Sequence, residues 1–219
     1  TSFDVDVSTA DGTATTADND YTSITNQTLT FAGTAGEQKT FTVTPTGDTD
    51  VEPNETLTVS MSNLVGAVVD ISDTATVTIN NDDSASVTIA DVSGAEDGGA
   101  ITVTAILDNA VSGGFDVDVS TADGTATTVD NDYIAITNQT LTFAGTANET
   151  RQFTVTLNSD TKVEPDETLT VSMSGVVAVV VDDAAINISD TATVTINNDD
   201  SAAVTIEDVT VTEGAGLLF

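Results

Sequence analysis

The chain consists largely of one segment that occurs twice. Residues 3–44, beginning FDVDVSTADGTATTADNDY, return at 115–156 as FDVDVSTADGTATTVDNDY, 112 positions later. The second copy then gains five residues, and 71–84 recurs at 188–201, 117 positions later. Self-similarity at a period of about 110 residues describes a module in a tandem array, so the fold is repeated along the chain.

The phase of the repeat divides the chain into three parts. Residues 201–219 align with 84–102, and the first copy begins at a point well inside its own module. We therefore expect a repeat lacking its first strands at 1–83, a complete repeat at 84–200, and the first strand of a third repeat at 201–219. On this interpretation the chain is a window cut from a longer array.

Apolar and polar residues alternate along the complete repeat, as they do in a strand with one buried face. Seven such segments are rich in Val and Thr and are separated by Gly, Asp and Asn. They lie at 85–89, 101–106, 115–120, 141–143, 153–157, 169–173 and 192–196. The pattern predicts an all-β chain of tandem immunoglobulin-like β-sandwiches with about seven strands each.

The run of six residues at 176–181, VVAVVV, is the longest β-branched stretch in the chain. One interpretation is a buried strand or a strand-like crossover between the last two strands. The other is an apolar contact face between neighbouring modules or chains.

The charge of the chain excludes several classes of partner. Three Lys and Arg face 36 Asp and Glu, which gives a net charge of −33. Such a chain repels nucleic acid and anionic lipid, so neither is an expected partner. No apolar run approaches the roughly 18 residues of a membrane helix, so this segment is not expected to insert. A hydrophobic content of 39% favours a packed core over a disordered acidic tail.

Cys and His are both absent from the chain. Their absence excludes disulfides, zinc–thiolate sites and thiol nucleophiles, and it removes the usual general base. Hard cations bound by carboxylate oxygens remain as a means of stabilisation.

Many acidic residues gather at predicted strand ends and loops. In the complete repeat they are Glu96, Asp97, Asp130, Asp132, Asp160, Glu164, Asp166, Glu167, Asp199 and Asp200. Greek-key crossovers bring such loops to one pole of a sandwich, where the carboxylates repel one another unless a cation lies among them. Ca²⁺ accepts 6–8 oxygens in flexible geometry, so it is the predicted cofactor. The alternative is a solvated acidic surface without specific sites, as in adaptation to high salt.

Several motifs together resemble the Calx-β domain, a module of sodium–calcium exchangers, integrin β4 and many large bacterial surface proteins. They are TADGTA at 121–126, NDY at 131–133, LTF at 141–143, VEPDETLTV at 163–171 and INNDD at 196–200. The resemblance covers the whole chain and implies a seven-stranded sandwich that binds several Ca²⁺ ions at one end.

The resemblance also implies a calcium-ligand set in each repeat. In the complete repeat it falls on Glu96, Asp132, Asp160, Glu164, Glu167, Asp199 and Asp200. In the first repeat and at the start of the third it falls on Asp20, Asp48, Glu52, Glu55, Asp82, Asp83 and Glu213. Asn197 and Asn198 stand where exchanger domains continue their acidic run, so we expect fewer or weaker ions than those domains bind.

The leading functional hypothesis is structural. Near-identical copies suit a calcium-rigidified extender of a long bacterial cell-surface or secreted adhesin or fibre, with adjacent repeats of the same chain as partners. One alternative is a filament subunit in which 201–219 donates a strand to a neighbouring copy. A second is a Ca²⁺-sensing regulatory domain. An enzyme is not expected, because paired acids such as Glu164 and Glu167 recur in every repeat without a basic or aromatic cleft.

Overall fold

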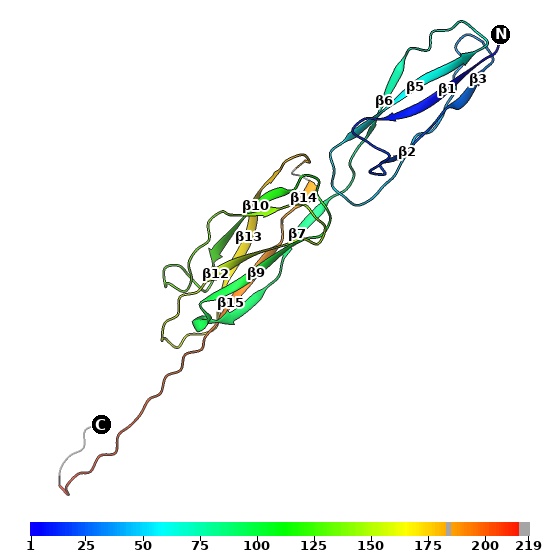
Figure 1. Cartoon of the computed structure of the whole chain (residues 1–219). Coiled ribbons are helices and arrows are strands. Elements are labelled where there is room, and N and C mark those ends of the chain that lie inside the picture. Colours follow the sequence, from blue (N-terminus) through cyan, green and yellow to red (C-terminus); the bar gives the residue numbers. More distant parts are fainter. Residues whose placement is uncertain (183–184, 215–219) are drawn as a thin grey trace.

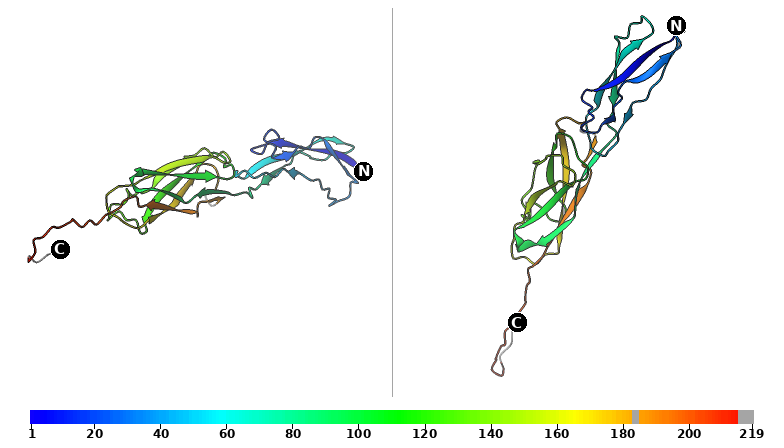
Figure 2. Two further views of the ribbon diagram at one scale, coloured as in Figure 1. Left: turned by 90° about the horizontal axis from the view of Figure 1, so that it is seen from below. Right: turned by 45° about the vertical axis from the view of Figure 1, so that its right-hand side comes forward.

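The computed structural model describes residues 1–182 and 185–214 (Figure 1). Two β-rich modules, here called the first module (1–83) and the second module (84–200), follow one another along an extended molecule. The tail, residues 201–214 of the described chain, continues beyond the second module without forming a strand (Figure 2). No helix among the described residues is long and apolar enough to cross a membrane.

The second module is a sandwich of two sheets, in the orders β11-β10-β13-β15-β8 and β12-β9-β7-β14. Its strands are β7 (Ala85–Ile89), β8 (Val92–Ala95), β9 (Ala100–Leu107), β10 (Phe115–Asp123), β11 (Gln139–Phe143), β12 (Thr150–Thr156), β13 (Glu167–Ala178), β14 (Ile186–Asn187) and β15 (Thr191–Asn197), with a 3₁₀ turn at Glu96–Gly98. The predicted all-β sandwich is confirmed, and each of the seven predicted segments overlaps a strand.

The first strand of this module is shared between the two sheets. β7 pairs antiparallel with β9 in one sheet, whereas β8 pairs parallel with β15 in the other. Two carboxylates hold the crossover: the Ile89 N–H donates to Asp190 Oδ2 at 2.9 Å, and the Thr193 N–H donates to Asp91 Oδ1 at 2.7 Å. The crossover therefore ties the first strand of the module to its last strand.

The core of the second module lies between the two sheets. The alternation seen in the sequence places Val103, Val117, Val155 and Leu169 on the inner faces, where they are fully buried. The rings of Phe115 and Phe143 stack with centroids 5.0 Å apart. The polar positions of the same strands, mainly Thr and Ser, face outward.

The first module has one four-stranded sheet, in the order β3-β1-β5-β6, and a short β2-β4 pair. Its strands are β1 (Phe3–Asp11), β2 (Tyr21–Thr22), β3 (Gln27–Phe31), β4 (Thr44–Pro45), β5 (Glu55–Val65) and β6 (Thr74–Ile79). Residues 1–83 contain no counterpart of β7–β9. Phe41 and Val43, which correspond to Phe153 and Val155 of β12, lie outside any strand and are only half-buried.

One residue of the first module completes the core of the second. Val51 is fully buried among the core side chains of the second module and forms a parallel bridge with Val111. The Val51 N–H donates to the Ala110 carbonyl at 2.9 Å, and the Val51 carbonyl accepts from the Ser112 N–H at 2.8 Å. These contacts, together with the direct passage from Asp83 into β7, form what we call the joint.

The valine-rich run at 176–181 is at most half-buried, and only its first three residues lie in a strand. β13 ends at Ala178, and Val177, Val179 and Val180 are largely exposed, so the interpretation as a buried strand is wrong. Val180 and Val181 instead line a cleft of about 400 Å³ together with Glu52, Pro53, Asn54 and Asn81 of the first module. This position agrees with the alternative prediction of a contact face between modules.

Candidate metal centres

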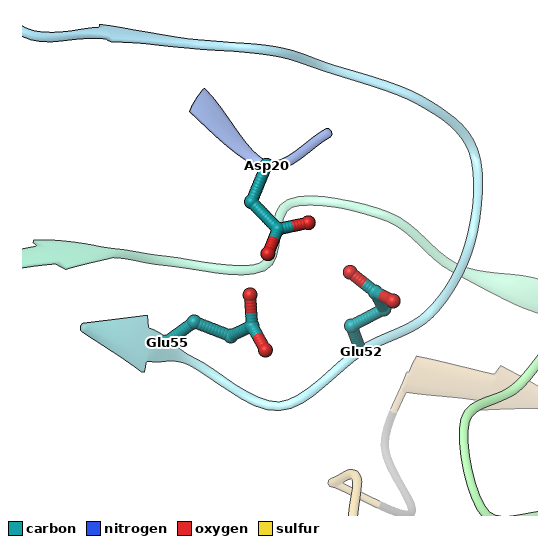
Figure 3. Close-up of side chains that lie close together, drawn as sticks. All are labelled: Asp20, Glu52 and Glu55. Carbon is teal, nitrogen blue, oxygen red and sulfur yellow. The ribbon is translucent and has the colours of Figure 1, made fainter. Parts of the chain in front are cut away.

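Three carboxylates converge at the end of the first module that meets the joint. Asp20 precedes β2, Glu52 lies in the loop between β4 and β5, and Glu55 is the first residue of β5. Figure 3 shows the three side chains pointing toward one another. One oxygen from each lies within 4.8 Å of the others, a spacing at which a single cation can contact all three.

Local hydrogen bonds explain why these side chains meet. Asp20 Oδ2 accepts from the Thr15 N–H at 2.6 Å, which fixes the carboxylate at the tip of its loop. The Glu52 N–H donates to Asn81 Oδ1 at 3.1 Å, and Pro53 keeps the chain between the two glutamates extended. Loops far apart in sequence are thus held at one pole before any ion binds.

Further acids surround the same three carboxylates. Together they line a pocket of about 60 Å³ with Asp48, Asp50, Asp82 and Asp83. Seven carboxylates in one small pocket repel one another strongly, because unit charges 4 Å apart interact by about 4 kcal/mol at an effective dielectric constant of 20. A divalent cation in the pocket reduces that repulsion.

The second module repeats this arrangement at its far pole. Asp132, Glu164 and Glu167 converge as Asp20, Glu52 and Glu55 do. The loop is held in the same way, since the Glu164 N–H donates to Asn198 Oδ1 at 3.0 Å. Lys162 Nζ donates to Glu164 Oε1, whereas Asp50 occupies the corresponding position in the first module.

A second cluster lies beside this one in the second module. Glu96, in the 3₁₀ turn before β9, meets Asp199 and Asp200, which follow β15. Glu96 also lines the pocket formed by Asp132, Glu164 and Glu167, so the two clusters are contiguous. The crossover of β7 and β8 explains the meeting, because β8 and β15 run parallel and end at the same pole.

Burial and mutual repulsion disfavour the charged form of several of these acids. Burial, followed by the charge of Asp20, raises the pKa of Glu55 to about 7. Burial and then Asp132 raise the pKa of Glu167 to about 7. The pKa of Glu96 is also raised, again mainly by burial. Acids in this state at neutral pH are poised to exchange a proton for a cation.

The residues fit a hard cation. Within the described part of the chain, Asp200 Oδ2 is a buried oxygen that receives no hydrogen bond. Glu96, only 8% exposed, is buried beside it among acids instead of basic partners. A buried carboxylate oxygen without a donor costs free energy that a bound ion recovers. The oxygen-only ligand set suits Ca²⁺, which accepts mono- and bidentate carboxylates.

The structure brings most of the sequence-predicted ligands together. Nine of them form the three clusters, and Asp48, Asp82 and Asp83 line the first pocket. Asp160 lies at the edge of the second-module site, where its N–H donates to Glu96 Oε1 at 2.9 Å and its own Oδ1 accepts from the Lys162 N–H at 2.6 Å. Glu213 lies exposed in the tail and joins no cluster of residues that the structure describes.

Two residues lie at the sites but were not predicted as ligands, although Asp97 was named among the acidic loop residues. Asp97 belongs beside Asp199, since its N–H donates to Asp199 Oδ2 at 3.2 Å and a side-chain hydrogen bond with Asp199 raises the pKa of Asp97. The position of Asp97 next to Glu96 in the sequence could have identified Asp97 as a site residue. Asn198 does not replace a ligand but holds the loop, because its Nδ2 also donates to the Asp200 carbonyl at 3.0 Å.

The chain is similar to solved structures titled "Crystal structure of Apo-form Calx CBD1 domain" (21% identity, 54% of this chain and 100% of that chain, TM-score 0.45) and "Crystal structure of CBD12 from CALX1.2" (21% identity, 90% of this chain and 88% of that chain, TM-score 0.42). No curated protein sequence matches the chain.

The family model for the Calx-beta domain matches residues 1–91 and again residues 81–200. The two matches together cover both modules and overlap at the joint. Calx-beta domains bind Ca²⁺ and are not enzymes, which agrees with the predicted cofactor and the predicted lack of catalysis. The chain belongs to the Calx-beta family, as a tandem of two domains.

Proposed function

We propose that this chain is a calcium-rigidified spacer from a long bacterial cell-surface or secreted protein, such as an adhesin or fibre. The ligands are the three carboxylate clusters with their neighbouring acids. The near-identity of the two modules supports this role, because a spacer needs units that stack in the same way. Extracellular Ca²⁺, typically millimolar, is sufficient for sites with dissociation constants of roughly 10⁻⁴–10⁻³ M.

The main support for this proposal is the position of the cluster formed by Asp20, Glu52 and Glu55. Glu52 directly follows Val51, the residue that the first module contributes to the core of the second. A cation held by Asp20, Glu52 and Glu55 therefore fixes the loop that presents Val51. Calcium binding in one module thus stabilises the orientation of the next. At a Ca²⁺ concentration of one to ten times the dissociation constant, each site contributes about 0.4–1.4 kcal/mol of stability.

The test measures interdomain order and stability in the same samples. Spin labels placed on the outer faces of β1 and β10 give the distance distribution between modules with Ca²⁺, with EGTA, and with EGTA plus concentrated NaCl. We expect a narrow distribution and a high melting temperature only with Ca²⁺. The double variant Glu52→Gln/Glu55→Gln broadens the distribution in Ca²⁺, whereas Asp116→Asn, a strand acid outside the clusters, leaves it narrow. Full replacement of Ca²⁺ by NaCl would favour the high-salt alternative.

Calorimetric titration separates the spacer from a Ca²⁺ sensor. A spacer in a millimolar Ca²⁺ environment saturates near that concentration, whereas a cytosolic sensor saturates in the micromolar range. Micromolar saturation with a large shape change would replace the spacer role by regulation.

Strand donation between copies is a second candidate, favoured by one observation. The first module has an open apolar groove of about 210 Å³ lined by Val7, Leu29, Phe31, Phe41, Val59 and Met61, among others. The tail carries residues 202–206, AAVTI, which correspond to ASVTI of β7, and Val204 is 96% exposed. A tail inserted into this groove supplies the missing first strand of the module and links copies into a filament.

Gel filtration of the full chain and of a chain ending at Asp200 tests strand donation. Oligomers that form only with the tail support it, and Val204→Asp should abolish them. A monomer in both samples at high concentration removes the filament hypothesis and leaves the spacer unaffected.

A further inference from the structure

The two modules present the same valine in two different environments. Val51 and Val163 occupy equivalent positions in the two copies of the Val-Glu-Pro segment. Val51 is fully buried in the joint, whereas Val163 is 55% exposed and forms no bridge within the described residues. An apolar residue that is buried in one copy and exposed in the other marks a surface whose partner is present only in the first case.

We propose that Val163 and its loop form a docking surface for a further module of this type. The docking partner is the Ala110–Ser112 segment of that module, which receives the side chain and both backbone hydrogen-bonding groups of Val163. The contact copies the joint between Val51 and Val111.

The loop around Val163 makes the same internal hydrogen bonds as the docked loop around Val51. Asn198 receives the Glu164 N–H at 3.0 Å, as Asn81 receives the Glu52 N–H at 3.1 Å. The Asn198 amide then donates to the Asp200 carbonyl at 3.0 Å, as the Asn81 amide donates to the Asp83 carbonyl at 3.1 Å. Because these bonds lie inside each module, the loop is preorganised and its docking requires little further ordering.

The receiving segment is equally well defined. The Val111 N–H donates to the Gly145 carbonyl at 2.9 Å, and the Val111 carbonyl accepts from the Gly114 N–H at 3.1 Å. The Asn109 side chain donates to the Ser84 carbonyl at 2.9 Å, which holds the connection between modules against the same segment. All of these groups come from residues 84–145, so any module with this sequence presents the same receptor.

The two surfaces lie at opposite poles of the second module. The Ala110–Ser112 segment contacts Val51 at the joint, whereas Glu164, next to Val163, bonds to Asn198 just before the tail. Figure 1 shows that the tail leaves from the end away from the first module. A contact between unlike poles is heterologous, so it extends as an open array unless the rotation between modules closes a ring. Each added module therefore exposes a new valine, so docking can be repeated along an array. A covalent connection as short as Asp83-Ser84-Ala85 supplies the high effective concentration that a small contact needs.

The test compares amide exchange at Val51 and Val163 within one molecule. We extend the chain by repeating residues 84–200 directly after Asp200 and measure exchange by NMR in saturating Ca²⁺. The Val163 amide should become at least about tenfold slower than in the 219-residue chain and approach the rate of Val51, because its N–H then donates to a buried carbonyl. Core amides of the added module, such as the copy of Val103, verify that it is folded.

Two outcomes would overturn the inference: a Val163 amide that exchanges equally fast in both chains while Val51 stays protected, or protection that survives in the Val163→Asp variant of the extended chain. The inference rests on the proposed spacer role, but different measurements test the docking of Val163 and the effect of Ca²⁺. Loss of Ca²⁺ dependence at both joints would refute calcium rigidification and leave docking intact. Protection at Val51 alone would refute docking by Val163 and leave the spacer role intact.

Discussion

Truncation of Val51 should destabilise a module to which it does not belong in sequence. Val51→Ala removes two methyl groups from a fully buried side chain in the core of the second module. At about 0.8 kcal/mol for each buried carbon, plus a small residual cavity, the second module loses about 2 kcal/mol of unfolding free energy. Val163→Ala is the matched control, because the same chemical change at a 55% exposed position costs less than about 0.5 kcal/mol.

The chain offers a simple optical assay for this comparison. It has two Tyr and no Trp, and the tyrosines lie one in each module, at Tyr21 and Tyr133. In a Tyr21→Phe background, urea titration followed by tyrosine fluorescence reports the second module alone. We expect Val51→Ala to lower the midpoint while the slope stays unchanged, because the surface exposed on unfolding is nearly the same.

Equal effects of the two substitutions would refute the reasoning. If Val51→Ala left the Tyr133 transition in place, Val51 would not be docked in solution, and the modules would be joined only by the chain. A changed slope would instead indicate that the substitution alters how much of the chain unfolds in that transition, as when two coupled modules become independent.

The remaining predictions concern protons, ions and the loop that carries the ligands. In EDTA, Glu55 and Glu167 have a folded-state pKa of about 7 against an ordinary 4.5, so the metal-free fold holds protons more tightly than the unfolded chain. This stabilisation is fully present below about 4.5 and is lost as pH rises through about 7, so the melting temperature in EDTA should rise as pH falls across that range. In Ca²⁺ the melting temperature should instead fall as pH falls, because protons then compete with the ion for the carboxylates. A pH-independent melting temperature in both conditions would contradict the raised pKa values of Glu55 and Glu167. Lys162→Asp should tighten Ca²⁺ binding at the second-module site and Asp50→Lys should weaken it at the first, as calorimetry would show. Asn198→Ala removes two hydrogen bonds at 3.0 Å and should cost about 1–3 kcal/mol of unfolding free energy together with calcium affinity, whereas an unchanged affinity would show that the loop is held by other contacts.

Much of the second module could be predicted from local pattern. The alternation of Val and Thr is set by which face of each strand is buried, so it located segments such as 115–120 and 192–196 within observed strands. The run at 176–181 could not be interpreted from its pattern alone. A β-branched stretch does not reveal whether it packs against the module's own sheet or against another module. Its exposed valines lie where β13 leaves the sandwich.

The candidate sites were predictable as residues but not as clusters. The repeat singled out the acidic loops, and the family resemblance assigned ligands, but the grouping of Glu96 with Asp199 and Asp200 depends on the parallel pairing of β8 with β15. No local pattern encodes that pairing. The joint could not be predicted from the sequence either. Val51 and Val163 lie in near-identical segments and differ only in what packs beside them.

The parallel pairing of β8 with β15 has a mechanical consequence. The chain enters the second module through β7 and β8 and leaves it through β15, and the register from Val92↔Val194 to Asn197↔Ala95 aligns the two strands side by side. A pulling force on the ends of the molecule slides these strands along each other, so it loads their hydrogen bonds in shear and all at once instead of peeling them apart in sequence. A molecule built from such units resists stretching most strongly along its own long axis.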